Sequence, residues 1–423
     1  KLPESSSIMD CIIAMSTARV GACILTEDEL DVDNFIKFSY NIDEDMYNVE
    51  VLPVAEAVEF ESRKINKDEY DWECPDYEIK DGNDLVIYEL LLRDFTDNTY
   101  GEGNIPAAME GLDYIESLGV NAIELMPVQE FDGNNSWGYG NHAYFAMDKV
   151  YGTRDDYKAF IDACHQRGMA VFFDVVYNHA TGVHPYAALY WDDSVNNVTE
   201  SNPWFFTTPT HPYNVYHQWD HSNPMFREYV KKNLEYLIKE YKVDGFRFDL
   251  SKGFTKDPYR IESYNSERVG YLKEYRNHIK SVDPNAVMIC EHFVEDENYD
   301  LARADIKVWR NMNESFRESA MGWMSNASFE GLRDTNLPFG TLVGYMESHD
   351  EERICYGATE DASSVKWGIC GTLTSWGDKP DITMTADGVF YVAKNVTIAA
   401  DDMFKIRVNS EWKDAFNYGA SSK

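Results

Sequence analysis

The chain has 423 residues, 44% of them hydrophobic and 14% aromatic, which is enough for one large globular domain with smaller attachments. Its formal net charge of -36 excludes nucleic acid and anionic membranes as favoured partners, because both would repel it. Seven cysteines form no CxxC pair and no zinc-like spacing, which argues against a disulfide framework, and no run of 18 apolar residues predicts a transmembrane segment.

The first part of the chain, residues 1–83, has weak and mixed patterns. An apolar stretch is followed by the alternating sequence NVEVLPVAEAVEFESR, which suggests strands, so this region is expected to be β-rich. The start lacks the order of a secretion signal. Because the chain begins with Lys rather than Met, a leader already removed is compatible, and the start of the sequence does not identify the compartment. We expect an extracellular or cell-surface location rather than a cytoplasmic one.

Residues 84–360 alternate short apolar strands with amphipathic helices, the pattern of a parallel sheet or barrel. Thr153 and Asp156 have capping-box spacing at the start of one such helix. The expected strands are 85–92, 121–127, 169–176, 245–250, 286–291, 306–309 and 341–348.

An insertion at 177–224 follows the third strand and is rich in Trp, Tyr, His, Asn and Pro. Its aromatic content argues against disorder, so we expect it to cover the carboxyl ends of the strands. From 365 to 423 the sequence changes to alternation and turn residues. This predicts a small antiparallel β module, with ADG (386–388) and AADD (399–402) at hairpin positions.

Three of the predicted strands end in a carboxylate. GFRFDL ends at Asp249, AVMICE at Glu291, and the strand before ESHDE is followed by Asp350. Arg247, two residues before Asp249, can pair with it and keep it ionised. Buried opposite charges are costly unless they are paired or used, so a structural ion pair and a functional site are both open readings of GFRFDL taken alone. Acidic groups gathered at strand ends indicate a site.

With these motifs in order, the chain resembles the α-amylase superfamily, glycoside hydrolase family 13. The resemblance covers roughly residues 84–353 and rests on DVVYNH (174–179), GFRFDLSKG (245–253), Glu291 and ESHDE (347–351). It implies an α/β fold, a (β/α)8 TIM barrel with an insertion after strand 3. Too few residues separate Arg353 from the β module for a complete barrel, so the eighth βα unit is expected to be missing or shortened.

The resemblance also implies roles for individual residues. Asp249 would be the nucleophile, Glu291 the general acid/base that must hold its proton, and Asp350 a third carboxylate that holds sugar hydroxyls. Asp174 is expected to orient other groups rather than to catalyse. The residues expected to bind substrate are Tyr139, His179, Arg247, Lys252 and His349.

The resemblance leaves calcium open as a structural ion, with Asn178 as the one candidate ligand, and it implies no redox or phosphate cofactor. The C-terminal β module resembles starch-binding β domains of gut-bacterial surface glycan-binding proteins. Trp376, Trp412 and Tyr418 could stack on glucose rings there, or they could form the core of the module.

The expected function is that of a retaining hydrolase acting on internal α-1,4 bonds of starch or glycogen-like α-glucans. An α-glucan branching enzyme or other glucanotransferase shares the same carboxylates and stays an alternative. A non-catalytic α-glucan-binding protein is a second alternative, because the barrel is expected to be shortened and the C-terminal β module resembles starch-binding domains.

Overall fold

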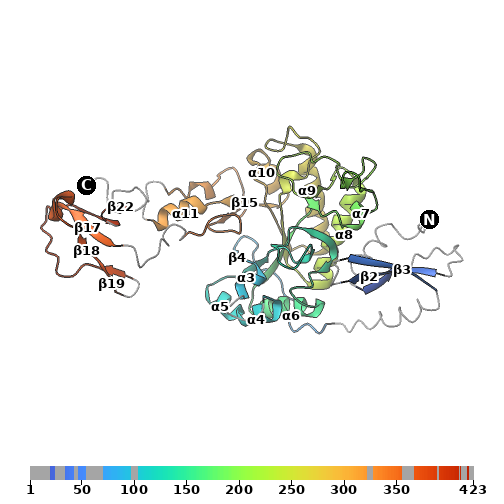
Figure 1. Ribbon diagram of the computed structural model, residues 1–423, viewed down its shortest axis with the longest axis horizontal. Coiled ribbons are helices and arrows are strands. Elements are labelled where there is room, and N and C mark those ends of the chain that lie inside the picture. Colours follow the sequence, from blue (N-terminus) through green and yellow to red (C-terminus); the bar gives the residue numbers. More distant parts are fainter. Residues whose placement is uncertain are drawn as a thin grey trace. The chain divides into compact units, whose positions relative to one another are not determined.

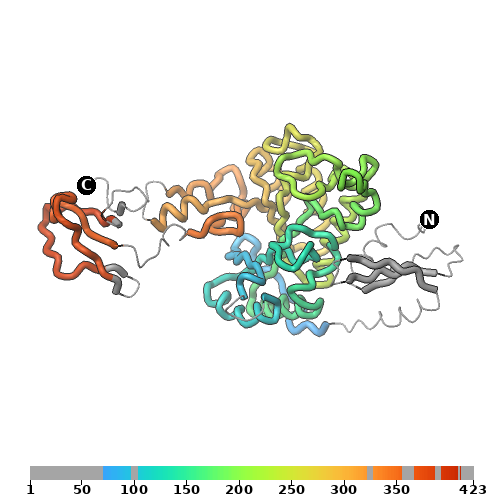
Figure 2. Tube along the Cα trace, in the orientation of Figure 1, coloured from blue at the N-terminus to red at the C-terminus, as the bar shows by residue number. Residues whose placement is uncertain are grey.

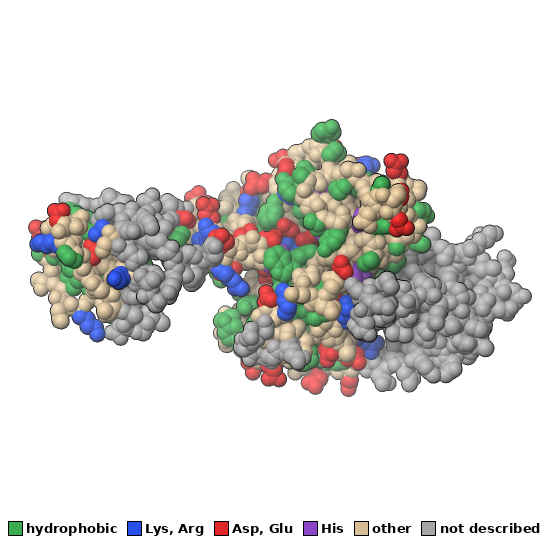
Figure 3. Space-filling model, viewed as in Figure 1, with side chains coloured by type: hydrophobic (Ala, Val, Ile, Leu, Met, Phe, Trp, Pro, Cys, Tyr) green, Lys and Arg blue, Asp and Glu red, His purple; other side chains and the backbone are tan. Residues whose placement is uncertain are grey.

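The computed structural model describes residues 20–23, 34–41, 46–53, 70–96, 103–321, 327–354, 366–387, 390–408, 410 and 417–418. Within them the chain forms two compact units. The first comprises residues 1–309 and 335–343, and the second comprises 310–334 and 344–423. Acidic side chains are spread over the visible face rather than gathered in one patch (Figure 3), as expected for charge that serves solubility.

A curled parallel sheet with outer helices is the centre of the first unit (Figure 1). Its strand order is β16-β15-β14-β13-β8-β5-β4, and the pairings from β4 to β15 are all parallel. The strands are β4 (Ile87–Leu90), β5 (Ala122–Leu125), β8 (Ala170–Val175), β13 (Gly245–Phe248), β14 (Val287–Cys290), β15 (Lys307–Asn311) and β16 (Leu342–Tyr345). Each lies within or next to a predicted strand, which confirms the barrel-type fold class with seven described strands.

Helices follow the strands and pack side by side in chain order, as the colour sequence of Figure 2 shows. Contacts run from α4 to α6, to α8, to α9 and to α10. The helices are α3 (Leu92–Thr96), α4 (Ile105–Glu110), α5 (Leu112–Ser117), α6 (Arg154–Gln166), α8 (Pro224–Tyr241), α9 (Ser266–Val282) and α10 (Glu295–Ala302). The predicted capping box starts α6: Asp156 N–H donates to Thr153 Oγ1 at 3.3 Å, and Thr153 N–H donates to Asp156 Oδ2 at 2.7 Å.

One hairpin was not predicted. β6 (Gln129–Phe131) pairs antiparallel with β7 (Asn141–Met147) between β5 and α6. Its register is irregular and both strands are fully buried, so the alternation that marks a half-exposed hairpin is absent from the sequence. Between its strands lies WGYG, so the hairpin is what carries Tyr139 to the carboxyl ends of the parallel strands.

The insertion after β8 is folded through short pieces of regular structure and a buried aromatic cluster. Its elements are β9 (His179–Ala180), α7 (Pro185–Ala188), β10 (Trp191–Asp192), β11 (Asn197–Val198) and β12 (His217–Gln218). Trp219, 1% exposed, stacks on Phe205 at 3.8 Å and on Phe226 of α8 at 4.2 Å between ring centroids. Aromatic burial of this size holds the loop in place, as its composition indicated.

Smaller sheets form the ends of the described chain. β1 (Val20–Cys23), β2 (Asn34–Asn41) and β3 (Met46–Pro53) make an antiparallel sheet. Toward the C-terminus, β17 (Trp367–Gly371), β18 (Ile382–Thr383), β21 (Phe404–Val408) and β22 (Asn417–Tyr418) form a second one, beside the hairpin of β19 (Thr385–Asp387) and β20 (Phe390–Val392). Ala386 and Asp387 of ADG therefore lie at a hairpin, as predicted, while Gly388 lies outside the described residues. AADD does not lie at a hairpin, because β20 and β21 belong to different sheets.

The second unit also contains α11 (Asn313–Ala320), which begins directly after β15. Helices long and apolar enough to span a membrane are not found among the residues placed by the structure.

We expect Trp219→Ala to lower the free energy of unfolding by about 3–5 kcal/mol, because it removes the ring that joins the insertion to α8 and leaves a cavity. Urea unfolding followed by circular dichroism measures this change. Tyr259→Ala is the matched control, since Tyr259 is 91% exposed and its removal leaves no cavity. Equal unfolding free energies for both variants would contradict a cluster that anchors the insertion.

Candidate active site

Three carboxylates meet on the guanidinium of Arg247, which is completely buried on β13. Nη1 donates to Asp174 Oδ2 at 2.7 Å and to Asp249 Oδ1 at 3.0 Å. Nη2 donates to Glu291 Oε2 at 2.8 Å. One cation thus faces three acidic side chains from neighbouring strand ends. The sequence predicted only the contact of Arg247 with Asp249, and not those with Asp174 and Glu291.

Strand register explains why these groups converge. Arg247 lies opposite Asp174 on β8 and opposite Ile289 on β14. Parallel strands end at the same edge of a sheet, so the residues just beyond β13 and β14 are neighbours. The side chains of Asp249 and Glu291 remain 12% and 13% exposed, so both can be reached from outside.

Besides Arg247, the backbone at and just beyond the end of β13 also binds Glu291. Leu250 has φ 40° and ψ 45°, in the left-handed region that non-glycine residues rarely adopt. In this conformation its N–H donates to Glu291 Oε2 at 2.8 Å. Glu291 N–H in turn donates to the carbonyl of Phe248 at 3.0 Å. The peptide after Asp249 therefore binds the carboxylate of Glu291 directly.

Aromatic rings enclose the guanidinium. Arg247 lies 4.2 Å from the ring centroid of Trp309 and 5.9 Å from that of Tyr139. The Tyr139 hydroxyl donates to Asp174 Oδ2 at 2.7 Å. Burial raises the pKa of Tyr139 well above its usual range, and the charge of Asp174 adds to this, so the phenol keeps its proton. Asp174 thus orients other groups, and Arg247 has no surface left with which to bind a sugar, contrary to the expectation that it contacts substrate.

His179 lies close to the same group of residues but is committed to protein contacts. Its Nε2 donates to the carbonyl of Tyr139 at 2.8 Å, and Nδ1 accepts from the Asn178 side chain at 3.1 Å. Burial lowers the pKa of His179 to about 4, so the ring is neutral at pH 7. A hydrogen bond from His179 to a sugar would have to replace one of these two contacts.

The amide of Asn178 is fully bonded by protein groups. His211 Nε2 donates to its Oδ1 at 3.1 Å, and its Nδ2 donates to Asn214 Oδ1 at 3.1 Å. A Cβ at Gly253 would lie 2.0 Å from that Oδ1, so only glycine fits there. Calcium prefers several oxygen ligands, and no cluster of three or more His, Cys, Asp or Glu side chains suited to a metal occurs in the described part of the chain. These residues do not fit a calcium site at Asn178.

Lys252 marks the outer side of the site. Its Nζ donates to Glu262 Oε1 at 2.9 Å and lies 4.1 Å from the ring centroid of Tyr213, which is 46% exposed. Tyr216, 51% exposed, has its ring centroid 5.7 Å from that of His179. Both tyrosines come from the insertion. Its aromatic composition signalled such residues, but no spacing in the sequence singled out these two.

His349 and Asp350 belong to the second compact unit. His349 Nε2 lies 3.4 Å from Asp350 Oδ1, and Asp350 N–H donates to Ser348 Oγ at 3.2 Å. The Asp350 side chain is 54% exposed. The meeting of Asp350 with Asp249 and Glu291 stays a prediction.

Of the three aromatic residues predicted to bind glycan in the C-terminal module, only Trp376 has a described side chain. It is 43% exposed and adopts φ 54° in a kinked turn, η3 (Thr372–Gly377), after β17. Trp412 and the side chain of Tyr418 lie outside the described residues.

Comparison with known proteins finds similarity to alpha-amylase catalytic domains in the barrel region. Residues 87–223 match the family described as alpha amylase, catalytic domain. Malto-oligosyltrehalose trehalohydrolase of Deinococcus radiodurans is 33% identical over 208 residues, which are 48% of this chain and 31% of that protein. Alpha-amylase 3 of Dictyoglomus thermophilum is 26% identical over 320 residues, 68% of this chain and 61% of that protein.

Among solved structures, pullulanase type I from Bacillus subtilis str. 168 complexed with maltose superposes with a TM-score of 0.54 at 20% identity. The superposition covers 78% of this chain and 54% of the pullulanase. It shows a shared fold. This chain spans less than two thirds of the length of each of these three proteins.

The buried neutral histidine gives a pH prediction. The pKa of His179 is about 4 when folded and about 6.5 when unfolded, so between these values the unfolded chain binds one more proton. Its contribution to stability is complete above the unfolded pKa and is lost as pH falls toward the folded one. We expect His179→Gln to reduce the slope of unfolding free energy against pH by up to about 1.4 kcal/mol per pH unit in this window.

Urea unfolding at a series of pH values between the two pKa values measures the slope. His278→Gln serves as a control, because the His278 side chain is 22% exposed and should change the slope less. A slope that His179→Gln leaves unchanged would mean that His179 is not buried as a neutral ring.

Proposed function

We propose that this chain is a retaining glycoside hydrolase that cleaves internal α-1,4 bonds of starch or glycogen-like α-glucans. The observation that carries the proposal is the binding of Asp249 and Glu291 to one buried guanidinium at the carboxyl ends of adjacent strands. Retaining glycosidases need two carboxyl groups about 5 Å apart, and this arrangement supports such a pair.

In this proposal Asp249 attacks the anomeric carbon and forms the covalent glycosyl intermediate. Its contact with Arg247 favours the ionised form that a nucleophile requires. Glu291 gives a proton to the departing oxygen and later takes one from water. Arg247 and Leu250 N–H both donate to Oε2 of Glu291, so Oε1 is the oxygen proposed to exchange the proton with the leaving group and with water.

The remaining assignments follow the family resemblance. Asp350 is proposed to hold sugar hydroxyls and favour distortion of the ring, with His349 beside it. Tyr139 and His179 are proposed to contact the sugar at the cleavage point, and Lys252 the leaving-group side. Support for the last comes from its place at the outer side of the site, against the exposed ring of Tyr213.

The linkage is the least constrained part of the proposal. The relatives carry the names of an amylase, a malto-oligosyltrehalose trehalohydrolase and, at 32% identity over 200 residues, the isoamylase SU1 of Zea mays. A debranching hydrolase is therefore a second candidate. Digestion of amylose and of pullulan, with product analysis, separates the two, and new α-1,6 linkages made from amylose would instead indicate a branching enzyme.

The C-terminal module and a location outside the cytoplasm belong to the same proposal. Trp376 presents an exposed aromatic face, which suits the apolar face of a sugar. A chain that binds starch through this module and releases no reducing ends would be a non-catalytic α-glucan-binding protein.

We expect Asp249→Asn and Glu291→Gln each to reduce kcat on amylose by about 10³-fold or more, because each removes a group that acts in the transition state. Reducing-end release measures the rates, and circular dichroism shows whether the fold is kept. Asp113→Asn is the matched control, since the Asp113 side chain is 84% exposed and pairs with Arg167 at the surface. Wild-type rates in either site variant would exclude these roles.

We expect Trp376→Ala to weaken binding to granular starch several-fold while hydrolysis of short maltooligosaccharides changes little. A sugar-stacking ring that takes no part in bond cleavage affects only attachment to the polymer. Sedimentation with starch granules measures binding, and an equal loss on both substrates would argue against a separate binding surface.

A further inference from the structure

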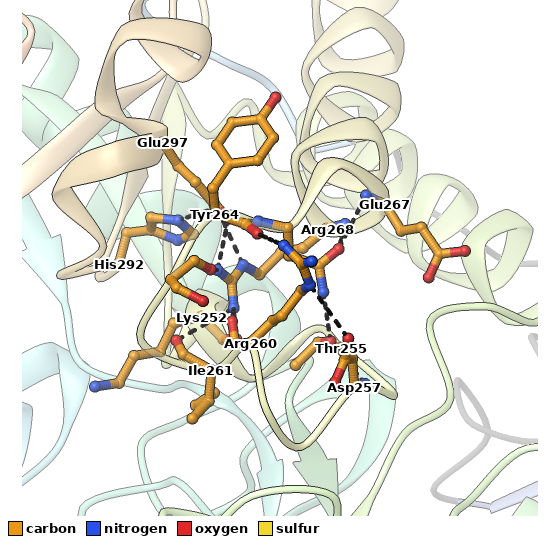
Figure 4. A network of polar contacts seen from close by, with 12 residues as sticks. Lys252, Thr255, Asp257, Arg260, Ile261, Tyr264, Glu267, Arg268, His292 and Glu297 are labelled. Carbon is orange, nitrogen blue, oxygen red and sulfur yellow. Dashed lines mark hydrogen bonds and ion pairs between the residues drawn. The ribbon is translucent and has the colours of Figure 1, made fainter.

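A buried ion pair joins α9 to α10 (Figure 4). Arg268 and Glu297 are both fully buried. Arg268 Nη2 donates to Glu297 Oε1 at 2.6 Å, and Nε donates to Oε2 at 3.0 Å. Two parallel hydrogen bonds of this kind fix both distance and orientation. The pair is therefore a rigid point between the helices that follow β13 and β14.

The loop after β13 wraps around this guanidinium. Arg268 donates to the carbonyls of Lys252 at 2.7 Å, Arg260 at 3.1 Å and Ser263 at 3.0 Å. Figure 4 shows the loop residues gathered about Arg268. The segment that starts at the proposed nucleophile is thus held from inside by one side chain.

Glu297 also contacts His292, the residue that follows Glu291. His292 Nε2 donates to Glu297 Oε2 at 2.7 Å, and its Nδ1 lies 2.9 Å from Ser251 Oγ. Burial lowers the pKa of His292, so the ring is neutral and Nδ1 accepts. The Ser251 hydroxyl then has two acceptors within reach, this nitrogen and the Glu291 carbonyl.

Ser251 and Leu250 together hold Glu291 at both ends. Ser251 N–H donates to the Glu291 carbonyl at 2.9 Å, and Leu250 N–H donates to the carboxylate. The one hydroxyl hydrogen of Ser251 is shared between that carbonyl, 2.8 Å from Oγ, and His292 Nδ1, 2.9 Å from Oγ. Leu250 and Phe293 both have positive φ, 40° and 51°. Leu250 follows Asp249 directly and Phe293 lies two residues after Glu291, and their left-handed backbone conformations show that the surrounding contacts outweigh local backbone preference.

We propose that Ser251 and His292, fixed by the Arg268–Glu297 ion pair, are positioning residues that set Glu291 at the distance from Asp249 that proton donation requires. This rests on the proposed function. None of the four side chains is exposed, so none contacts substrate. They act only through where Glu291 and the loop of Lys252 are held.

Substrates with different leaving groups can distinguish a mutation that displaces the catalytic acid from one that loosens the whole fold. A maltooligosaccharide needs a proton on its departing oxygen, whereas the fluoride of α-maltosyl fluoride leaves without one. In both cases Asp249 forms the bond to the anomeric carbon as the old bond breaks. Displacing Glu291 therefore slows the first substrate and spares the glycosylation step of the second, while a loosened fold slows both.

The test compares kcat/KM, which reports the steps up to and including glycosylation, for the wild type and Ser251→Ala on maltoheptaose and on α-maltosyl fluoride. We expect about a tenfold loss on maltoheptaose and less than about a threefold loss on the fluoride, because the acid is displaced rather than removed. The rate of Ser251→Cys on maltoheptaose should lie between those of the wild type and Ser251→Ala, because a thiol is a weak hydrogen-bond donor. Ser281→Ala is the control, since Ser281 Oγ donates to the His278 carbonyl on α9 away from the site.

The outcomes are distinct. Equal losses of Ser251→Ala on both substrates, or no loss on either, would overturn the positioning role while leaving the proposed function intact. Wild-type protein that cleaves neither substrate would instead overturn the proposed function. A Ser251→Cys variant no better than Ser251→Ala on maltoheptaose would show that the hydroxyl contact is not what positions Glu291.

Discussion

The site depends on one interaction, the contact of the buried Arg247 guanidinium with Asp174, Asp249 and Glu291. Removing three carboxylates from water would be costly without a cation among them, and a fixed planar fork satisfies them at set distances. The same contact draws the ends of β8, β13 and β14 together. The strand register brings the three carboxylates close together at one edge of the sheet, and Arg247 binds all three there.

Backbone conformation near this cation helps to hold the proposed catalytic residues in place. Leu250 takes a strained conformation that aims its N–H at Glu291. The ion pair of Arg268 with Glu297 holds the loops from the other side. Strain of this kind persists only where neighbouring contacts impose it, and it occurs here at Leu250, directly after Asp249, and at Phe293, two residues after Glu291.

The insertion places a second layer over the strand ends. Its aromatic core around Trp219 is buried, while Tyr213 and Tyr216 keep exposed faces beside Lys252 and His179. A packed loop of this type presents rings without losing much entropy when a ligand binds, because the rings are already ordered. The side-chain oxygen of Asn178, the candidate calcium ligand, accepts a hydrogen bond from His211.

The sequence alone determined the strand and helix periodicity, the seven strands, the capping box of α6 and the carboxylates that end β13 and β14. These are local features, because side-chain spacing reports which face of an element is buried. Only the tertiary structure decided that Arg247 binds three acids rather than one, that it is closed to substrate, and that Ser251, His292, Glu297 and Arg268 form one chain of contacts. Such contacts join residues far apart in sequence, and their distances depend on how strands and loops pack, which no local pattern encodes.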